Sequence, residues 1–151
     1  MSNLGNLAII ASVAALDQIV KFAVENGIRL GGSRHFFGGY LKIRPVYNSG
    51  GAFGIFAHRG EFFTGFSILM ICLLIASLFL FDFKFYPAGL GLSFMAGGAL
   101  GNLIDRLRNG AVTDFVQIGK FPIFNLADAV IVIGAGLIIT SIFLEGKNVQ
   151  K

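Results

Sequence analysis

Four long runs of the chain are apolar and almost free of charge. The runs are residues 4–24, 62–81, 87–104 and 126–144. Asp17 and Lys21 lie near the end of the first run, and Asp128 lies near the start of the last. A bilayer core of about 30 Å needs about 20 apolar residues in a helix. The pattern predicts one all-α membrane domain over residues 1–151, with four transmembrane helices.

Two of these runs have a second interpretation. The first run could be a cleaved signal peptide, because small residues stand at 11–14. However, no Lys or Arg precedes the run, and its apolar stretch continues past these positions. The fourth run is short enough for a re-entrant segment. We expect spans in both places.

The number of spans determines which segments share a side of the membrane. Four spans put both termini on one side, and put segments 25–61 and 105–125 together on the other side. Most polar side chains capable of chemistry fall at this second side. They are Asp17, Lys21, Asn102, Asp105, Arg106, Asp114, Asn125 and Asp128. The pattern therefore predicts that function is concentrated at one membrane face.

The two segments at this face carry strand patterns. Residues 40–47 partly alternate apolar and polar side chains, although Pro45 should confine this strand to a sheet edge. Residues 112–118 are rich in β-branched side chains and follow the turn pair Asn109-Gly110. We expect a small β-sheet resting on the membrane.

Composition excludes several other classes of protein. The chain is 55% hydrophobic and 13% charged, about half the charge of a soluble domain, and the hydrophobicity excludes disorder. The net charge of +4 comes without a basic run, which argues against nucleic acid. Cys72 is the single cysteine, and no Cys/His spacing suggests zinc. We expect neither a metal nor a cofactor.

Asp114 and Asp128 are the strongest candidates for chemistry. A carboxyl on a half-buried strand, or in a membrane helix, is costly and is a functional candidate. Two carboxyls that meet share a proton, so that one acts as base on a water and the other as acid. Two alternatives stay open. Asn125 and Asp128 have the spacing of a helix cap, and the same carboxyls could conduct ions or protons.

Two more polar groups have helical spacing. Asn102, Asp105 and Arg106 would share a helix face, where an Asp–Arg contact would brace the end of the third span. Orienting a catalytic group is the alternative function. Asp17 and Lys21, at i and i+4, are expected to form a structural pair.

Five motifs in order resemble the bacterial lipoprotein signal peptidase family (signal peptidase II, aspartic peptidase family A8). They are Asp17-Gln18-Ile19-Val20-Lys21, Asn48-Ser49-Gly50-Gly51-Ala52-Phe53-Gly54, Gly101-Asn102-Leu103-Ile104-Asp105-Arg106, Val112-Thr113-Asp114-Phe115 and Phe124-Asn125-Leu126-Ala127-Asp128. The resemblance covers nearly the whole chain. It implies an aspartic endopeptidase that cuts prolipoproteins before a diacylglyceryl-modified cysteine.

The resemblance also implies functions for residues. Asp114 and Asp128 would be catalytic. The residues that line or brace the site would be Asn48, Gly50, Asn102, Asp105, Arg106 and Asn125. The partners would be prolipoprotein substrates and membrane lipids, and we expect a monomer. A small transporter using the same carboxyls is the alternative, and a non-catalytic assembly factor is a third interpretation.

Charge conflicts with the orientation that the family implies. The family places the active site at the outer face of the bacterial cytoplasmic membrane, with both termini inside. The site side holds nine of the basic residues: Lys21, Arg29, Arg34, Lys42, Arg44, Arg59, Arg106, Arg108 and Lys120. The other side holds Lys84, Lys147 and Lys151. The positive-inside rule would reverse the protein; we follow the family and expect the extra cations to contact lipid phosphates.

Overall fold

The computed structural model describes residues 2–50, 60–81 and 86–149. It contains four long helices, each with a stretch apolar enough to cross a membrane. They are α1 (Asn3–Gly27), α2 (Gly60–Leu80), α3 (Tyr86–Asn109) and α4 (Leu126–Val149). The four predicted spans are confirmed. The third helix continues past residue 104 to Asn109, so its polar end belongs to the same helix as its apolar part.

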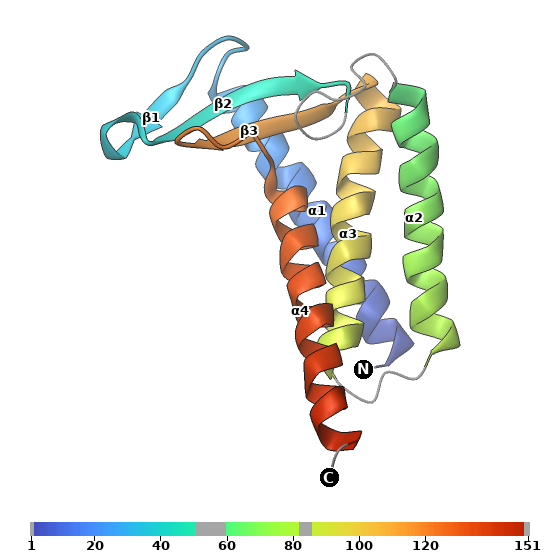
Figure 1. The fold of residues 1–151 in the computed structure, drawn as a ribbon. Coiled ribbons are helices and arrows are strands. Elements are labelled where there is room, and N and C mark those ends of the chain that lie inside the picture. Colours follow the sequence, from blue (N-terminus) through green and yellow to red (C-terminus); the bar gives the residue numbers. More distant parts are fainter. Residues whose placement is uncertain (1, 51–59, 82–85, 150–151) are drawn as a thin grey trace.

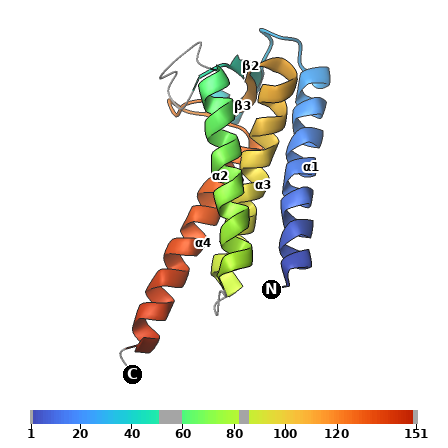
Figure 2. The ribbon, with the colours of Figure 1, turned by 90° about the vertical axis from the view of Figure 1, so that its right-hand side faces the viewer.

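Helix α3 is the centre of the bundle and packs against α1, α2 and α4 (Figures 1 and 2). Glycines permit the close approach that membrane helices use for packing. A Cβ on Gly97 would lie 2.7 Å from Cβ of Val13 in α1, and one on Gly98 would lie 2.6 Å from the carbonyl oxygen of Ala127 in α4. The exposed side chains agree with a membrane bundle, because many large apolar side chains on α2 and α4 face outward, as contact with lipid requires.

Two glycines in the middle of α4 have different surroundings. A Cβ on Gly134 would lie 2.6 Å from the carbonyl oxygen of Gly91 in α3, so Gly134 permits close packing of the two helices. Gly136 is exposed, and a Cβ there would meet nothing within 4 Å among the described residues.

Three antiparallel strands form a sheet in the order β1-β2-β3. They are β1 (Arg34–Phe36), β2 (Leu41–Asn48) and β3 (Val112–Ile118), and a short 3-10 turn, η1 (Phe37–Gly39), joins the first two. The two predicted strands are confirmed, and β1 is an addition. Gly110, which we read as part of a turn before β3, ends α3 in a left-handed conformation (φ 70°) with its N–H donating to the carbonyl of Arg106.

The expectation that Pro45 puts its strand at the sheet edge is wrong. Strand β2 is central, with β1 on one side and β3 on the other. Proline is tolerated for two reasons. The β1 ladder reaches only as far as Ile43, and the pairing with β3 shifts register between Ile43 and Val46. Pro45 therefore stands where there is no regular ladder for it to interrupt.

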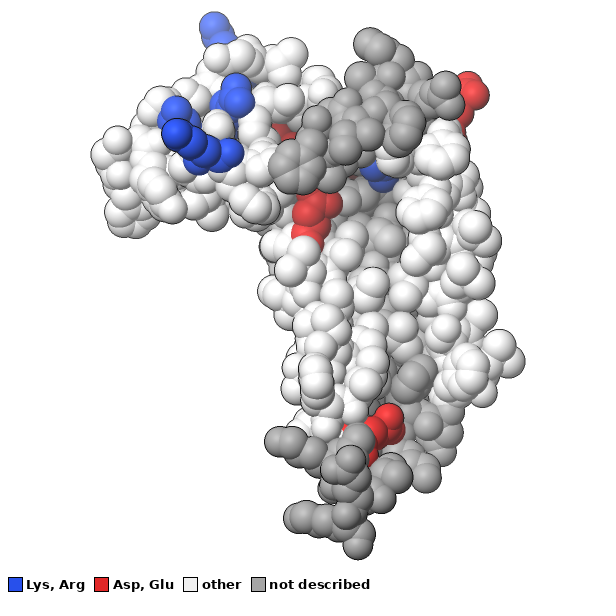
Figure 3. Space-filling model, in the orientation of Figure 1, with Lys and Arg blue, Asp and Glu red and all other residues white. Residues whose placement is uncertain are grey.

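The sheet lies at one end of the bundle and both chain ends lie at the other (Figure 1). This arrangement confirms the parity of the spans and the gathering of polar residues on one side. On the face drawn in Figure 3, basic side chains cluster over the sheet, and acidic atoms reach the surface where the sheet meets the helices. The candidate site lies at this junction.

Candidate active site

Asp114 sits on β3, opposite Val46 of β2, and its side chain is buried. Its two oxygens each accept one hydrogen bond, from Nδ2 of Asn48 at 2.9 Å and from Nδ2 of Asn125 at 2.8 Å. Burial raises the pKa of Asp114 to about 6, and the nearby charge of Asp128 raises it as well, against the two amide donors. A carboxyl in this position can hold a proton in mildly acidic water.

Asp128 lies in the first turn of α4, and it is part of the helix cap. Its backbone N–H donates to Oδ1 of Asn125 at 2.9 Å, and its Oδ2 accepts from the backbone N–H of Asn125 at 3.3 Å. The capping interpretation is therefore confirmed. Its other oxygen, Oδ1, accepts a hydrogen bond from Nδ2 of Asn102 at 2.8 Å. Asp128 thus joins the helix cap to a side chain of α3.

Two asparagines connect the two carboxyls. Nδ2 of Asn125 donates to Oδ1 of Asp114 at 2.8 Å and to Oδ1 of Asn102 at 3.0 Å. Nδ2 of Asn102 in turn donates to Asp128. Asn48 is oriented in the same way, because its Oδ1 accepts from the backbone N–H of Gly50 at 3.0 Å and leaves its Nδ2 for Asp114. The amides hold both carboxyls in place without neutralising them.

Both carboxyls open into one cavity of about 360 Å³ between the sheet, α3 and α4. Asn48, Gly50, Asn102 and Arg106 line it too, together with an apolar wall that includes Phe121 and Ile131. The predicted site residues that line this cavity are Asn48, Gly50, Asn102, Arg106, Asp114 and Asp128. Residues 51–54 of the second motif lie outside the described residues.

A second cavity of about 320 Å³ lies beside the first, between α2, α3 and α4. The two share Asn102, Arg106 and Ile131 as lining residues. The rest of the second lining is almost entirely apolar, for example Phe66 and Leu74. The cavity that holds the two carboxyls thus adjoins a space suited to hydrocarbon.

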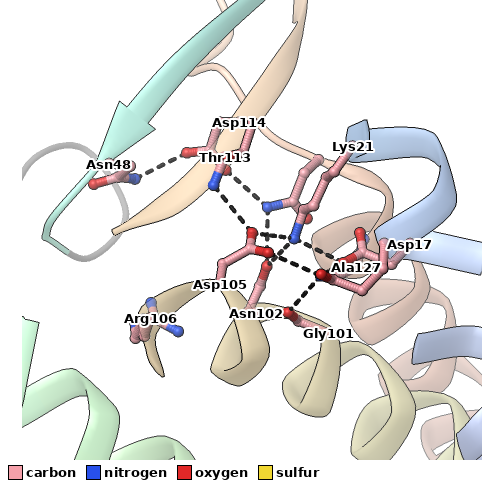
Figure 4. A network of polar contacts seen from close by, with 12 residues as sticks. Asp17, Lys21, Asn48, Gly101, Asn102, Asp105, Arg106, Thr113, Asp114 and Ala127 are labelled. Atoms are coloured by element: carbon pink, nitrogen blue, oxygen red, sulfur yellow. Dashed lines mark hydrogen bonds and ion pairs between the residues drawn. The ribbon is translucent and has the colours of Figure 1, made fainter. Parts of the chain in front are cut away.

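Asp105 does not pair with Arg106, although the sequence predicted this contact. It forms an ion pair with Lys21 of α1 at 2.7 Å. Arg106 points the other way, toward α2, where it donates to the hydroxyl of Ser67 at 3.3 Å and stands 5.8 Å from the ring centre of Phe63 (Figure 4). Adjacent residues on a helix point about 100° apart, so these two side chains serve different neighbours.

The pair of Asp17 and Lys21 is confirmed, with 2.7 Å between Nζ and Oδ2. Both side chains are buried. The pair contacts other elements as well: Nζ of Lys21 donates to Oδ1 of Asn102 at 3.0 Å, and Oδ1 of Asp17 accepts from the backbone N–H of Ala127 at 3.0 Å. A Cβ on Gly101 would lie 2.5 Å from Oδ2 of Asp17, so Gly101 makes room for this carboxylate.

Three residues of the polar network had no assigned function in the sequence. Gln18 donates to Oδ1 of Asp105 at 2.8 Å, Thr113 donates its hydroxyl to Glu25 at 2.6 Å, and the N–H of Thr113 donates to Oδ2 of Asp105 at 3.1 Å. Gln18 follows Asp17 and Thr113 precedes Asp114. Their place beside these two aspartates is the feature of the sequence that could have indicated a function for them. Among the described residues, no group of three His, Cys, Asp or Glu side chains could hold a metal ion.

Comparison with known proteins identifies the family of this chain. The profile of the family described as Signal peptidase (SPase) II matches residues 9–144. A lipoprotein signal peptidase of Brevibacillus brevis is 38% identical over 142 residues, covering 93% of this chain and 95% of the relative. One of Moorella thermoacetica is 37% identical over 127 residues, covering 81% of each chain.

Solved structures agree with these relatives. One that is described as a bacterial membrane enzyme superposes with a TM-score of 0.86 at 32% identity, covering 95% of this chain and 90% of the other. A second, described in the same way, has a TM-score of 0.80, also at 32% identity, and covers 91% and 92%. The chain therefore belongs to the signal peptidase II family of lipoprotein signal peptidases, and it is an integral membrane protease.

Proposed function

We propose that this chain removes signal peptides from diacylglyceryl-modified prolipoproteins as an aspartic endopeptidase. Asp114 and Asp128 would activate water against the peptide bond that precedes the lipidated cysteine. The observation that carries the proposal is the convergence of two carboxyls, one from a strand and one from a helix, on one cavity. The membership of the family supports the substrate class.

The chemistry divides between the two acids. The ionised carboxyl takes a proton from the attacking water, while the protonated one donates a proton to the carbonyl oxygen of the scissile bond. The tetrahedral species then collapses in one exchange of protons. The leaving amine takes the proton that the first carboxyl received from water, and the second carboxyl, now ionised, takes a proton back from a hydroxyl as the carbonyl forms again. Asp114 suits the proton-holding function because its pKa is raised to about 6. Asp128, at a helix N-terminus whose dipole favours negative charge, suits the base.

Substrate recognition would use the apolar cavity and the bilayer. The second cavity adjoins the carboxyls through Asn102 and Arg106, and its apolar lining suits hydrocarbon from the lipidated cysteine or the signal helix. Arg106 lines both cavities and could contact carbonyl or ester oxygens at their junction. Every group of the proposed site comes from one chain, so a monomer is sufficient.

The proposed location is the outer face of the bacterial cytoplasmic membrane, with both termini in the cytoplasm. The resemblance to the family supports this orientation. The basic residues on the sheet side oppose it by the positive-inside rule. We propose that these cations contact lipid phosphates instead.

Cleavage of a diacylglyceryl-modified prolipoprotein by the purified protein in detergent tests the function. Wild type would be assayed beside Asp114→Asn and Asp128→Asn, each with and without a chelator. Glu145→Gln makes the same kind of change on an exposed acid near the far end of α4. Asn is close in size to Asp but cannot ionise, so both site variants should lose at least about 10³-fold in kcat/KM.

The outcomes separate the alternatives. Cleavage by wild type and Glu145→Gln, with loss in both site variants, supports the carboxyl pair without a metal. Full activity in either site variant would refute the pair. Failure of a folded wild type to cleave would refute the proposed function, and inhibition by the chelator would point to a metal.

A further inference from the structure

One buried cation stands at the centre of the polar network. Lys21 is 3% exposed, and its ammonium contacts Asp17 at 2.7 Å, Asp105 at 2.7 Å and Oδ1 of Asn102 at 3.0 Å. An ammonium has three donors, and these contacts use all of them. Its partners lie on α1 itself and on α3 (Figure 4).

Each of the two carboxylates also holds a backbone N–H. Oδ1 of Asp17 accepts from Ala127, and Oδ2 of Asp105 accepts from Thr113. Ala127 and Thr113 are the residues immediately before Asp128 and Asp114. Through one carboxylate each, Lys21 is therefore connected to the segments that carry both proposed catalytic acids.

The third contact orients an amide. Because an ammonium can only donate, the atom of Asn102 that faces Lys21 must be its oxygen. That orientation leaves Nδ2 of Asn102 to donate to Oδ1 of Asp128 at 2.8 Å, and it makes Oδ1 the acceptor for Nδ2 of Asn125 at 3.0 Å. If the amide were reversed, both of these hydrogen bonds would be lost.

We propose that Lys21 is a positioning residue that sets the placement of Asp114 relative to Asp128. This inference rests on the proposed function. A merely structural ion pair would need only Asp17, its neighbour one turn away. The second carboxylate, the amide and the two backbone contacts all lead from Lys21 to the acids, although α1 contributes no reacting group of its own.

The test replaces the cation and separates catalysis from binding. Lys21→Met keeps most of the length of the side chain and removes its charge and its donors. Small misplacement of reacting groups is costly, so kcat of the folded variant should fall about 100-fold while KM stays within about threefold. Lys42→Met makes the same change on β2, outside the network, and should keep the kcat of wild type. Thermal unfolding of each purified variant reports its folded fraction.

A second variant covers the case in which Lys21→Met does not fold. Ala127 donates to Oδ1 of Asp17 and Lys21 contacts Oδ2. Asp17→Asn replaces one of these oxygens by an amide nitrogen that cannot accept, so one of the two contacts is lost. Its kcat should fall at least about tenfold at nearly constant KM. If both residues act through the same contacts, Lys21→Met with Asp17→Asn should lose little more than Lys21→Met alone.

Several results would overturn the inference. The first is a folded Lys21→Met that keeps kcat within about threefold of wild type, or the same result for a folded Asp17→Asn if Lys21→Met does not fold. The second is a variant whose loss of activity lies in KM and not in kcat. The third is a fall in kcat of Lys42→Met as large as that of Lys21→Met. Each leaves the proposed function intact if wild type cleaves and Asp114→Asn does not. If wild type fails to cleave, the proposed function and this inference fall together.

Discussion

The environment of Asp114 differs from that of Asp128 at the scale of single residues. Asp114 is buried on a strand of the sheet, and its two oxygens each accept a hydrogen bond from an asparagine amide. Asp128 is half-buried at a helix start and takes part in its cap. Two chemically identical side chains therefore differ in their exposure to water and in their hydrogen-bond donors. This difference is what divides the proposed acid and base functions between them.

The raised pKa of Asp114 predicts the pH dependence of activity. If Asp114 must hold a proton in the free enzyme, kcat/KM should fall about tenfold per pH unit above about 6. Because the pKa of Asp114 in the folded protein lies above the ordinary value of 3.8, ionising this group also costs stability. Its contribution to the free energy of unfolding therefore declines as pH rises from 3.8 to about 6. Cleavage assays from about pH 4 to about pH 9 measure the first effect. A rate that stays level to about pH 8 would contradict the assignment.

Helix α3 unites the molecule at the scale of elements. It contacts the other three helices and β3, and its polar end carries Asn102 and Asp105 toward α1, α4 and the sheet. Its glycines allow backbones to approach closely enough for short polar side chains to meet across helices. A glycine therefore permits close helix packing only where it lies on the side of its helix that faces a neighbouring helix.

Two glycines in the middle of α4, Gly134 and Gly136, provide a test at this scale. Gly134→Ala would press its methyl against the carbonyl oxygen of Gly91, and should destabilise the protein by about 1–3 kcal/mol. The methyl of Gly136→Ala would enter open space, and alanine favours a helix more than glycine does. This substitution should be neutral or stabilise the protein by up to about 1 kcal/mol. Unfolding of the purified variants in the same detergent measures both. Equal effects of the two substitutions would show that contact with α3 is not the cause.

The whole molecule is polarised along the length of the helix bundle. The sheet, the polar network and most basic residues lie at one end, and both chain ends lie at the other (Figures 1 and 3). A site at the membrane boundary gives carboxyls access to water while the apolar cavity remains open to hydrocarbon. This polarity suits hydrolysis at a membrane surface better than a relay of acids through the bilayer.

Cysteine labelling tests the proposed orientation. In a Cys72→Ser background, His35→Cys on β1 should react with an impermeant reagent in intact cells, and Asn148→Cys should react only after the membrane is opened. The reason is that the sheet and the C-terminus lie at opposite ends of the bundle. Labelling of position 148 alone in intact cells would reverse the orientation and favour the positive-inside rule.

Much of the fold follows from local patterns in the sequence. Hydropathy determined the four spans and their parity, β-branched alternation indicated two of the three strands, and spacing indicated the Asp17–Lys21 pair and the cap of Asn125 and Asp128. These features depend on neighbours within about one helical turn or one strand, so periodicity can encode them. The shared side of the polar residues followed from the same parity.

Only the tertiary structure decided which of these polar residues touch. Lys21 meets Asn102 across 81 positions and Asn48 meets Asp114 across 66, and the choice of Lys21 over Arg106 as partner of Asp105 depends on how α1 packs against α3. The central place of β2 likewise depended on a third strand and an irregular register. Such contacts arise from packing between distant segments, which no spacing along one chain encodes.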